Sequence, residues 1–412
     1  MNAFTSPILV RNGAANVLPR IPLTASHSAF SEKWLQQQLF EHPLALPLRE
    51  IAPNVSEPVP VCMELNTVAG PADILYVTGT GQIILVETKL WRNPEARREV
   101  IAQILDYAKE LTTWTYEDLA REVARATGRG PKYLLDVARG RYPDLDEARF
   151  VDGINHNLRT GDIVLLVVGD GIRTGAEALV AFLERYGSLR FTFGLIEVAA
   201  YDVGDGDVLL QPRVLAKTEV MRRVVVVPVD RAGGELAIDL AAGDLMAAAQ
   251  TEGGLDQTQL TDYQRWLQSF WAEYMRRLKL DDTRQPIPKT VPRSTNAYFP
   301  MPPSGAESWI SAYVARSSGV VGVYLTWAST YADAASAFEY LQGDKEAIEI
   351  AIEDSVAWSY NGKVYSVGVK APLGEWSSEG ERVRALDYLL TMTNRFVNVF
   401  RPRLEAFTRG RN

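Results

Sequence analysis

Cysteine is nearly absent from this sequence, because Cys62 is the single one among 412 residues. One thiol excludes an internal disulfide and a cysteine-rich zinc site. Histidine is also scarce: three are present, at scattered positions, which argues against a histidine-rich metal cage. This composition predicts a protein of a reducing, cytoplasmic environment.

Long apolar runs and an excess of positive charge are missing as well. No run reaches the roughly 18 apolar residues of a membrane span, so no membrane partner is expected. The N-terminus lacks the charged start and apolar core of a secretion signal. The formal net charge is −8, which argues against a surface that binds DNA everywhere. An acidic enzyme can still contact DNA through a local basic groove.

The composition that is present indicates a folded chain of two or three domains. Hydrophobic residues make up 47% of the 412 positions and charged residues 23%, an ordinary globular balance. Residues 229–258 are rich in Gly, Ala and acids, which is typical of a linker. We therefore predict a first domain over 1–228, a linker over 229–258 and a C-terminal domain over 259–412.

The most informative stretch runs from Pro71 to Tyr107. Asp73 opens an apolar run, Thr78-Gly79-Thr80-Gly81 is a turn, and a second apolar run ends at Glu87 and Lys89. Side chains alternate along a strand, so Glu87 and Lys89 share one face and Thr88 points to the other. A hairpin then brings Asp73 back beside Glu87.

Two converging carboxylates with a neighbouring lysine suit a divalent metal. Mg²⁺, or Mn²⁺ in its place, prefers oxygen ligands and typically binds one or two carboxylates plus substrate phosphate oxygens. Such an ion polarises a phosphoryl group and lowers the pKa of a bound water. Lys89 is placed to orient that water or to stabilise developing negative charge. The plain alternative is a surface hairpin with a salt bridge.

This pattern resembles the PD-(D/E)xK nuclease superfamily, with Pro71, Asp73, Glu87 and Lys89 carrying the match and Ala72 inserted. Gln103 and Tyr107, four positions apart on one helical face, resemble the Gln-x-x-x-Tyr motif of the RecB-like branch. The resemblance implies a restriction-endonuclease-like α/β fold, with a mixed central sheet flanked by helices. It also implies that Asp73 and Glu87 bind Mg²⁺, that Lys89 assists the chemistry, and that Gln103 and Tyr107 position groups around the site.

Two further acids are candidates for an additional site carboxylate. In the resembled fold a first helix precedes the core hairpin and often contributes one, which indicates Glu32 in the helix predicted over 31–40. The alternative for Glu32 is a first-turn acid that favours the helix dipole. Glu64, in the strand predicted over 61–66, is the other candidate; its alternative is a strand carboxylate paired with Arg.

Arginines near this stretch are candidates for DNA contact. One set lies just beyond Lys89: Arg92, Arg97 and Arg98. Their guanidinium groups could clamp DNA phosphates. The alternative is that they only pair with Glu95 and Glu99. A second set is spaced four apart and shares one face if its helix extends far enough: Arg121, Arg125 and Arg129. A solvated helix face explains the second set equally simply.

The rest of the chain predicts sheet completion and then a smaller α+β domain. Strands are expected over 162–168, 191–201 and 208–214, with a helix over 174–186 between the first two. Residues 261–407 resemble a domain of unknown function found in bacterial proteins, some of them nuclease-associated. In it we predict helices over 261–278, 331–352 and 381–407, a loop over 284–303, and strands over 309–315, 320–327, 356–360 and 363–370.

Three functions remain open at this point. The first is an Mg²⁺-dependent DNA endonuclease that hydrolyses phosphodiester bonds in restriction, defence or DNA repair. The second is a catalytically inactive nucleic-acid-binding or scaffolding protein on the same fold. The third is a subunit of an assembly, in which the long C-terminal helices form a homodimer interface.

Overall fold

The computed structural model describes residues 6–21, 30–90, 96–170, 191–217, 262–305, 307–316, 318–328, 331–360 and 364–410. The chain divides into two compact units. Unit 1 comprises Met1–Trp114, Asp118–Pro143 and Thr160–Val227, and unit 2 comprises Thr115–Glu117, Asp144–Arg159 and Pro228–Asn412. The predicted limits at 228 and 259 remain a prediction, but residues 144–159, predicted in the first domain, group with unit 2.

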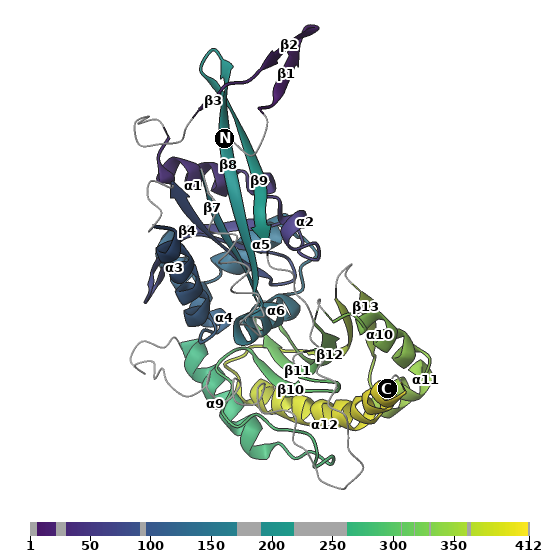
Figure 1. Cartoon of the computed structure of the whole chain (residues 1–412). Helices are drawn as coiled ribbons and strands as arrows, with labels where there is room; N and C mark the ends of the chain where they lie inside the picture. Colours follow the sequence, from purple (N-terminus) through teal and green to yellow (C-terminus); the bar gives the residue numbers. More distant parts are fainter. Residues whose placement is uncertain are drawn as a thin grey trace. The chain divides into compact units, whose positions relative to one another are not determined.

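Unit 1 is a mixed α/β structure built on a seven-stranded sheet (Figure 1). The sheet order is β3-β8-β7-β6-β5-β4, with β9 also paired to β8. The β6–β7 and β7–β8 pairs are parallel and the others are antiparallel, so the predicted mixed central sheet flanked by helices is confirmed. Its elements are β1 (Ile8–Arg11), β2 (Ala14–Val17), β3 (Arg20–Ile21), α1 (Glu32–Glu41), η1 (Pro43–Ala45), α2 (Leu48–Ile51), β4 (Val59–Thr67), β5 (Gly70–Val77), β6 (Ile83–Leu90), α3 (Ala96–Leu111), most of α4 (Tyr116–Thr127), α5 (Tyr133–Arg141), β7 (Ile163–Asp170), β8 (Thr192–Gly204) and β9 (Asp207–Lys217).

The alternation of side chains along β5 and β6 explains why α1 packs against these strands. Alternating apolar residues of β5 and β6, among them Ile74, Tyr76 and Val86, join one buried cluster with Leu35 and Leu39 of α1. The Ser31 Oγ accepts a hydrogen bond from Trp34 N at 3.0 Å and so caps the N-terminus of α1. α3 packs against β5, β6 and β7. These contacts fix both helices against the strands that carry the predicted site residues.

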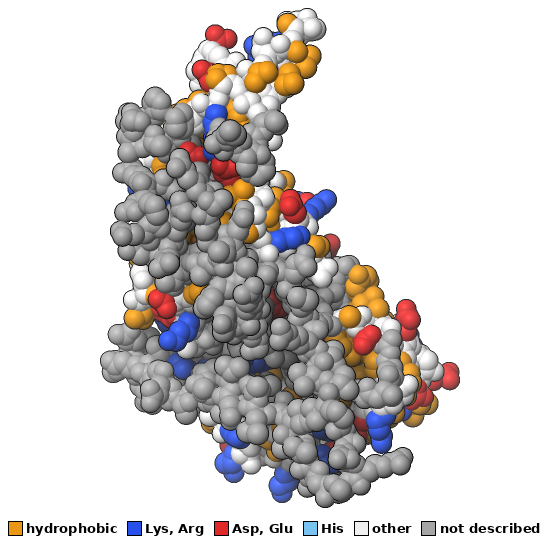
Figure 2. Space-filling view, in the orientation of Figure 1, with side chains coloured by type: hydrophobic (Ala, Val, Ile, Leu, Met, Phe, Trp, Pro, Cys, Tyr) orange, Lys and Arg blue, Asp and Glu red, His pale blue; other side chains and the backbone are white. Residues whose placement is uncertain are grey.

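The first two strands form a separate two-stranded ribbon. Leu9 packs against Leu18 and Tyr201, so one face of the ribbon is anchored on β8. Figure 2 shows apolar side chains on this ribbon, where Ile8, Val10 and Val17 are between 63% and 67% exposed. Three exposed β-branched side chains are too few to build an interface of ordinary size.

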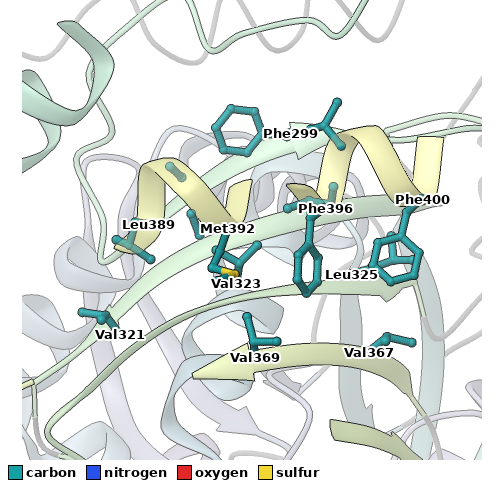
Figure 3. Close-up of a cluster of buried hydrophobic side chains, with 14 of the residues drawn as sticks. Phe299, Val321, Val323, Leu325, Val367, Val369, Leu389, Met392, Phe396 and Phe400 are labelled. Atoms are coloured by element: carbon teal, nitrogen blue, oxygen red, sulfur yellow. The ribbon is translucent and has the colours of Figure 1, made fainter. Parts of the chain in front are cut away.

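Unit 2 is built on a five-stranded antiparallel sheet of order β10-β11-β12-β14-β13. α12 lays its apolar side chains on this sheet: Phe396, Met392 and Leu389 meet residues of β12 and β14 (Figure 3). Full burial of such a side chain contributes about 1.5–3 kcal/mol, so this cluster holds the unit together. The elements are α6 (Glu147–Thr160), α9 (Asp262–Arg277), β10 (Asn296–Pro300), β11 (Ser308–Ala315), β12 (Val320–Trp327), α10 (Ala334–Gln342), α11 (Lys345–Ile352), β13 (Ala357–Tyr360), β14 (Tyr365–Pro372) and α12 (Glu379–Arg409).

The opposite face of this sheet is covered by α6, which the sequence analysis did not predict. Ala148 of α6 joins Tyr313 and Tyr324 in a second buried cluster. The Trp309 Nε1 donates to the Asp152 Oδ2 at 2.9 Å, and the pKa of this fully buried carboxyl is raised, chiefly by burial. A helix that lies between α5 and β7 in the sequence therefore completes the core of the C-terminal sheet.

Three further expectations need correction. The helix predicted over 331–352 is two helices, because Gly343 and Asp344 separate α10 from α11 and Gly weakens a helix interior by about 1 kcal/mol. The loop predicted over 284–303 contains β10, an edge strand, where Pro is tolerated. α5 was also missed. The predicted helix over 174–186 and the predicted linker over 229–258 lie outside the described residues.

The remaining predicted strands and helices of both units are confirmed within a few residues at their ends. No helix in the described ranges combines the length and the apolar character that crossing a membrane requires.

Candidate active site

The β5–β6 hairpin brings Asp73 and Glu87 together. Thr78 N donates to Gln82 O at 3.0 Å, and Gly81 has a φ of 80°, as a tight turn requires. The antiparallel register runs from Val77↔Ile83 to Ile74↔Val86, and Asp73 and Glu87 are the next residue on each strand beyond this last pair. On its other side β6 pairs in parallel with β7, with Glu87 beside Val167 and Lys89 beside Gly169. The hairpin predicted from the sequence is thus confirmed.

Asp73 is held by a residue that the sequence analysis assigned to the other face. Thr88 donates its backbone N–H at 2.6 Å and its hydroxyl at 2.5 Å to the Asp73 Oδ2. Regular pairing between β5 and β6 ends at Ile74↔Val86, so strand alternation no longer separates these side chains. Burial raises the pKa of Asp73, the two Thr88 donors lower it, and the charges of Glu64 and Glu32 raise it further.

Glu87 is the most strongly perturbed carboxylate of the site. It is 4% exposed, and burial, followed by the charge of Asp73, raises its pKa to about 8. Lys89 and the backbone N–H of Asp73 act in the opposite direction. Among the described residues, the buried Glu87 Oε2 has no hydrogen-bond partner. A buried carboxylate oxygen without a donor is costly unless a proton or a cation neutralises it.

α1 reaches the end of β6 through Glu32. Its Oε1 accepts from Leu90 N at 3.0 Å, and its Oε2 lies 3.6 Å from the Lys89 Nζ. Both side chains of the ion pair are more than 30% exposed, at 33% for Lys89 and 40% for Glu32, so the pair itself adds little stability. Glu32 therefore touches Lys89 and the strand end that carries it, whereas the alternative interpretation placed it in solvent at the helix terminus.

Glu64 is joined to the site by Gln36, a residue that the sequence analysis did not single out. The Gln36 Nε2 donates to the Glu64 Oε1 at 3.0 Å and to the Asp73 backbone O at 2.6 Å. The alternative for Glu64 was an arginine partner, and the partner found is this amide. Glu64 also has a φ of 55°, a backbone conformation that residues other than Gly seldom adopt inside a strand.

Gln103 and Tyr107 of α3 support the beginning of β5. The Gln103 Nε2 donates to the Tyr107 hydroxyl, which itself donates to Pro71 O at 2.9 Å. Pro71 stands two residues before Asp73. Burial raises the pKa of Tyr107 to about 12, although Gln103 opposes this, so the hydroxyl stays protonated at neutral pH. The pair fixes the strand that presents Asp73.

The candidate arginines contact residues other than the acids of the hairpin or lie outside what is described. Arg92 lies outside the described residues, as do the side chains of Arg97 and Arg98 in α3. Arg121 is 2.9 Å from Asp118 and 3.3 Å from Glu122, and Arg125 is 2.8 Å from Glu122. α4 ends at Thr127, so Arg129 does not continue its face and instead lies over the Tyr133 ring at 5.1 Å. The expected face of three arginines does not form.

One observation shows that the acids at the hairpin fit a magnesium or manganese ion: the buried Glu87 Oε2 has no donor among the residues that the structure describes. Asp73 and Glu87 would hold the ion. In the part of the chain that the structure describes, no three His, Cys, Asp or Glu side chains form a metal-binding group. A pair of carboxylates remains compatible with Mg²⁺, which usually keeps several waters and binds one or two carboxylates plus substrate phosphates.

Comparison of the chain with models of protein families, with curated proteins and with solved structures gave no match.

Two site residues had a weak signal in the sequence. Gln36 stands four positions after Glu32 and therefore shares its helix face. Thr88 lies between Glu87 and Lys89, but the alternation rule directed it away from them. Neither partner is identifiable without knowing where the β5–β6 pairing ends.

Proposed function

We propose that this chain is a metal-dependent DNA endonuclease that hydrolyses phosphodiester bonds on a restriction-endonuclease-like fold. The observation that carries the proposal is that Asp73 and Glu87 are neighbours at the end of the β5–β6 hairpin away from the turn, with the charge of Lys89 acting on Glu87. The buried Glu87 Oε2, which has no hydrogen-bond partner in the described part of the chain, supports a cation there. A bound Mg²⁺ or Mn²⁺ would polarise the scissile phosphate and acidify a coordinated water.

The protein groups have separate tasks in this proposal. Asp73 and Glu87 bind the cation through their carboxylate oxygens. Because both carboxylates are buried, a negative charge that no cation neutralises is unfavourable there. Lys89, about one-third exposed, places a positive charge beside them and can contact the phosphate as its charge develops. Gln103 and Tyr107 keep the strand of Asp73 in place. Restriction, defence against foreign DNA and DNA repair are all consistent with this chemistry.

A cleavage assay tests the proposal directly. Duplex, single-stranded, branched and mismatched DNA should be incubated with the protein in Mg²⁺, in Mn²⁺ and in EDTA. We expect metal-dependent cleavage of at least one form, with Lys89→Ala and Asp73→Asn losing at least a hundredfold in rate. Gln37→Met, at a half-buried position of α1, is the matched control. If no form is cut and Lys89→Ala behaves as the wild type does, the inactive binding or scaffolding alternative is favoured.

A further inference from the structure

A buried amide links the first helix to the acids of the site. Gln36 is polar but only 4% exposed, and its neighbours Leu35 and Leu39 belong to an apolar cluster. Its Nε2 carries two hydrogens, and both have acceptors: the Glu64 Oε1 and the Asp73 backbone O. A buried amide is retained where its hydrogen bonds are made. The two bonds connect one acid of the site with the backbone of another.

The backbone of Glu64 supports a specific role for this amide. Its φ of 55° departs from the strand geometry of its neighbours, so strand alternation does not decide where the carboxylate points. The registers Met63↔Ile74 and Leu65↔Ala72 place Glu64 opposite Asp73. A residue held in a rarely populated conformation indicates that its surroundings keep it there. The hydrogen bond from Gln36 is one contact that holds the Glu64 side chain in these surroundings.

The charge of Glu64 acts on the site although its carboxylate does not complete a metal-binding group. It raises the pKa of Asp73 and that of Glu87. Within the described ranges no three acids are arranged to share a metal. Glu64 is therefore near enough to interact electrostatically with the pair, while its Oε1 is bound to the amide of α1.

We propose that Gln36 is a positioning residue that holds the Glu64 carboxylate apart from Asp73 and Glu87 and so limits the metal site to two carboxylates. The inference rests on the proposed function. Loss of the amide donor would release Glu64 to join the pair, because a carboxylate without its hydrogen-bond donor is drawn to a divalent cation. An additional carboxylate ligand increases the affinity of a site for a hard cation.

Gln36→Met is the informative variant, because Met has a similar length and an unbranched shape but donates no hydrogen bond. Gln37→Met is the matched control, since Gln37 is the next residue of α1 and its side-chain amide donates to Glu41 of the same helix. Mn²⁺ binding is measured by calorimetry on the whole chain for wild type, Gln36→Met, Glu64→Gln and the double variant. Thermal unfolding of the same four proteins in EDTA gives a second, metal-free readout.

We expect Gln36→Met to bind Mn²⁺ at least tenfold more tightly than the wild type, and the double variant to lose this gain. Glu64→Gln alone should change the affinity threefold or less, and Gln37→Met should not change it. In EDTA, Gln36→Met and Glu64→Gln should each lower the melting temperature, and the double variant should melt no lower than Gln36→Met.

The inference is overturned if the affinity of Gln36→Met does not rise, if the gain persists in the double variant, or if the losses in EDTA are additive. It is also overturned if Glu64→Gln alone weakens binding as much as Asp73→Asn does, because Glu64 is then already a ligand. Failure of the proposed function has a different signature. If Mn²⁺ binds to Gln36→Met but not to the wild type, the inference stands and the proposed metal site of the native protein fails. If neither protein binds Mn²⁺, both fail.

Discussion

Glu87→Gln should remove a large pH dependence from the stability of unit 1 in the absence of metal. Burial and the charge of Asp73 raise the pKa of Glu87 from its usual 4.5 to about 8. The folded state therefore binds this proton more tightly than the unfolded state. The resulting stabilisation is complete below about pH 4.5 and is lost as the pH rises to about 8.

The size of the effect follows from the pKa difference. One pKa unit corresponds to about 1.36 kcal/mol, so the full interval is worth about 5 kcal/mol and the part between pH 5.5 and 9 roughly 3 kcal/mol. Solvent screening removes little of this, because Glu87 is 4% exposed. In Glu87→Gln no proton titrates at this position, so the same part of the pH dependence should be missing.

Hydrogen exchange in increasing urea, read by mass spectrometry on peptides of β5 and β6, measures this free energy for unit 1 alone. Measurements in EDTA should show that the free energy of unfolding of the wild type falls between pH 5.5 and pH 9 by roughly 3 kcal/mol more than that of Glu87→Gln. Glu50→Gln, at an exposed position of α2, controls for the loss of any carboxylate. Equal pH dependence in wild type and Glu87→Gln would refute the view that Glu87 is a buried carboxylate with a raised pKa.

Further predictions concern the core of unit 2, the support of Asp73 and the arginines of α4. A fragment of residues 259–412 lacks α6, so its free energy of unfolding should be lower than that of unit 2 in the whole chain by about 5 kcal/mol or more, since several aromatic side chains lose their cover. A peptide of residues 144–160 added in trans should bind the fragment and restore its thermal stability. Absence of peptide binding would contradict this. Thr88→Val should lower the free energy of unfolding by about 2 kcal/mol through loss of the hydroxyl donor to Asp73, whereas Thr88→Ser should not, as urea unfolding would reveal. Arg121→Gln should leave the affinity for DNA and its dependence on salt concentration unchanged, because the guanidinium already pairs with two acids. Fluorescence anisotropy measures both. A weaker dependence of the affinity on salt in the variant would show that Arg121 contacts phosphate.

The sequence was sufficient to predict the hairpin of unit 1 because its signals are local. Asp73, the glycine-containing turn and Glu87 lie within one short stretch, and strand alternation fixes their relative faces. The buried strand β7 was predictable for the same reason, since a continuous apolar run indicates burial on both faces.

The features that were missed depend on contacts distant in the sequence. The bond from Gln36 to Glu64 joins residues 28 positions apart, and the bond from Trp309 to Asp152 joins residues 157 apart. The amphipathic pattern of α6 does not reveal which sheet it covers. The role of Thr88 depends on where the β5–β6 pairing ends, which alternation alone does not predict.

The central claim is that Asp73 and Glu87 share one divalent cation beside Lys89. Anomalous diffraction from crystals soaked in Mn²⁺ tests it most directly. The account predicts one anomalous peak within about 2.5 Å of oxygens from both carboxylates, and no such peak in crystals of Asp73→Asn. A wild-type map without a peak at these carboxylates, from crystals in which the site is open to solvent, would contradict it.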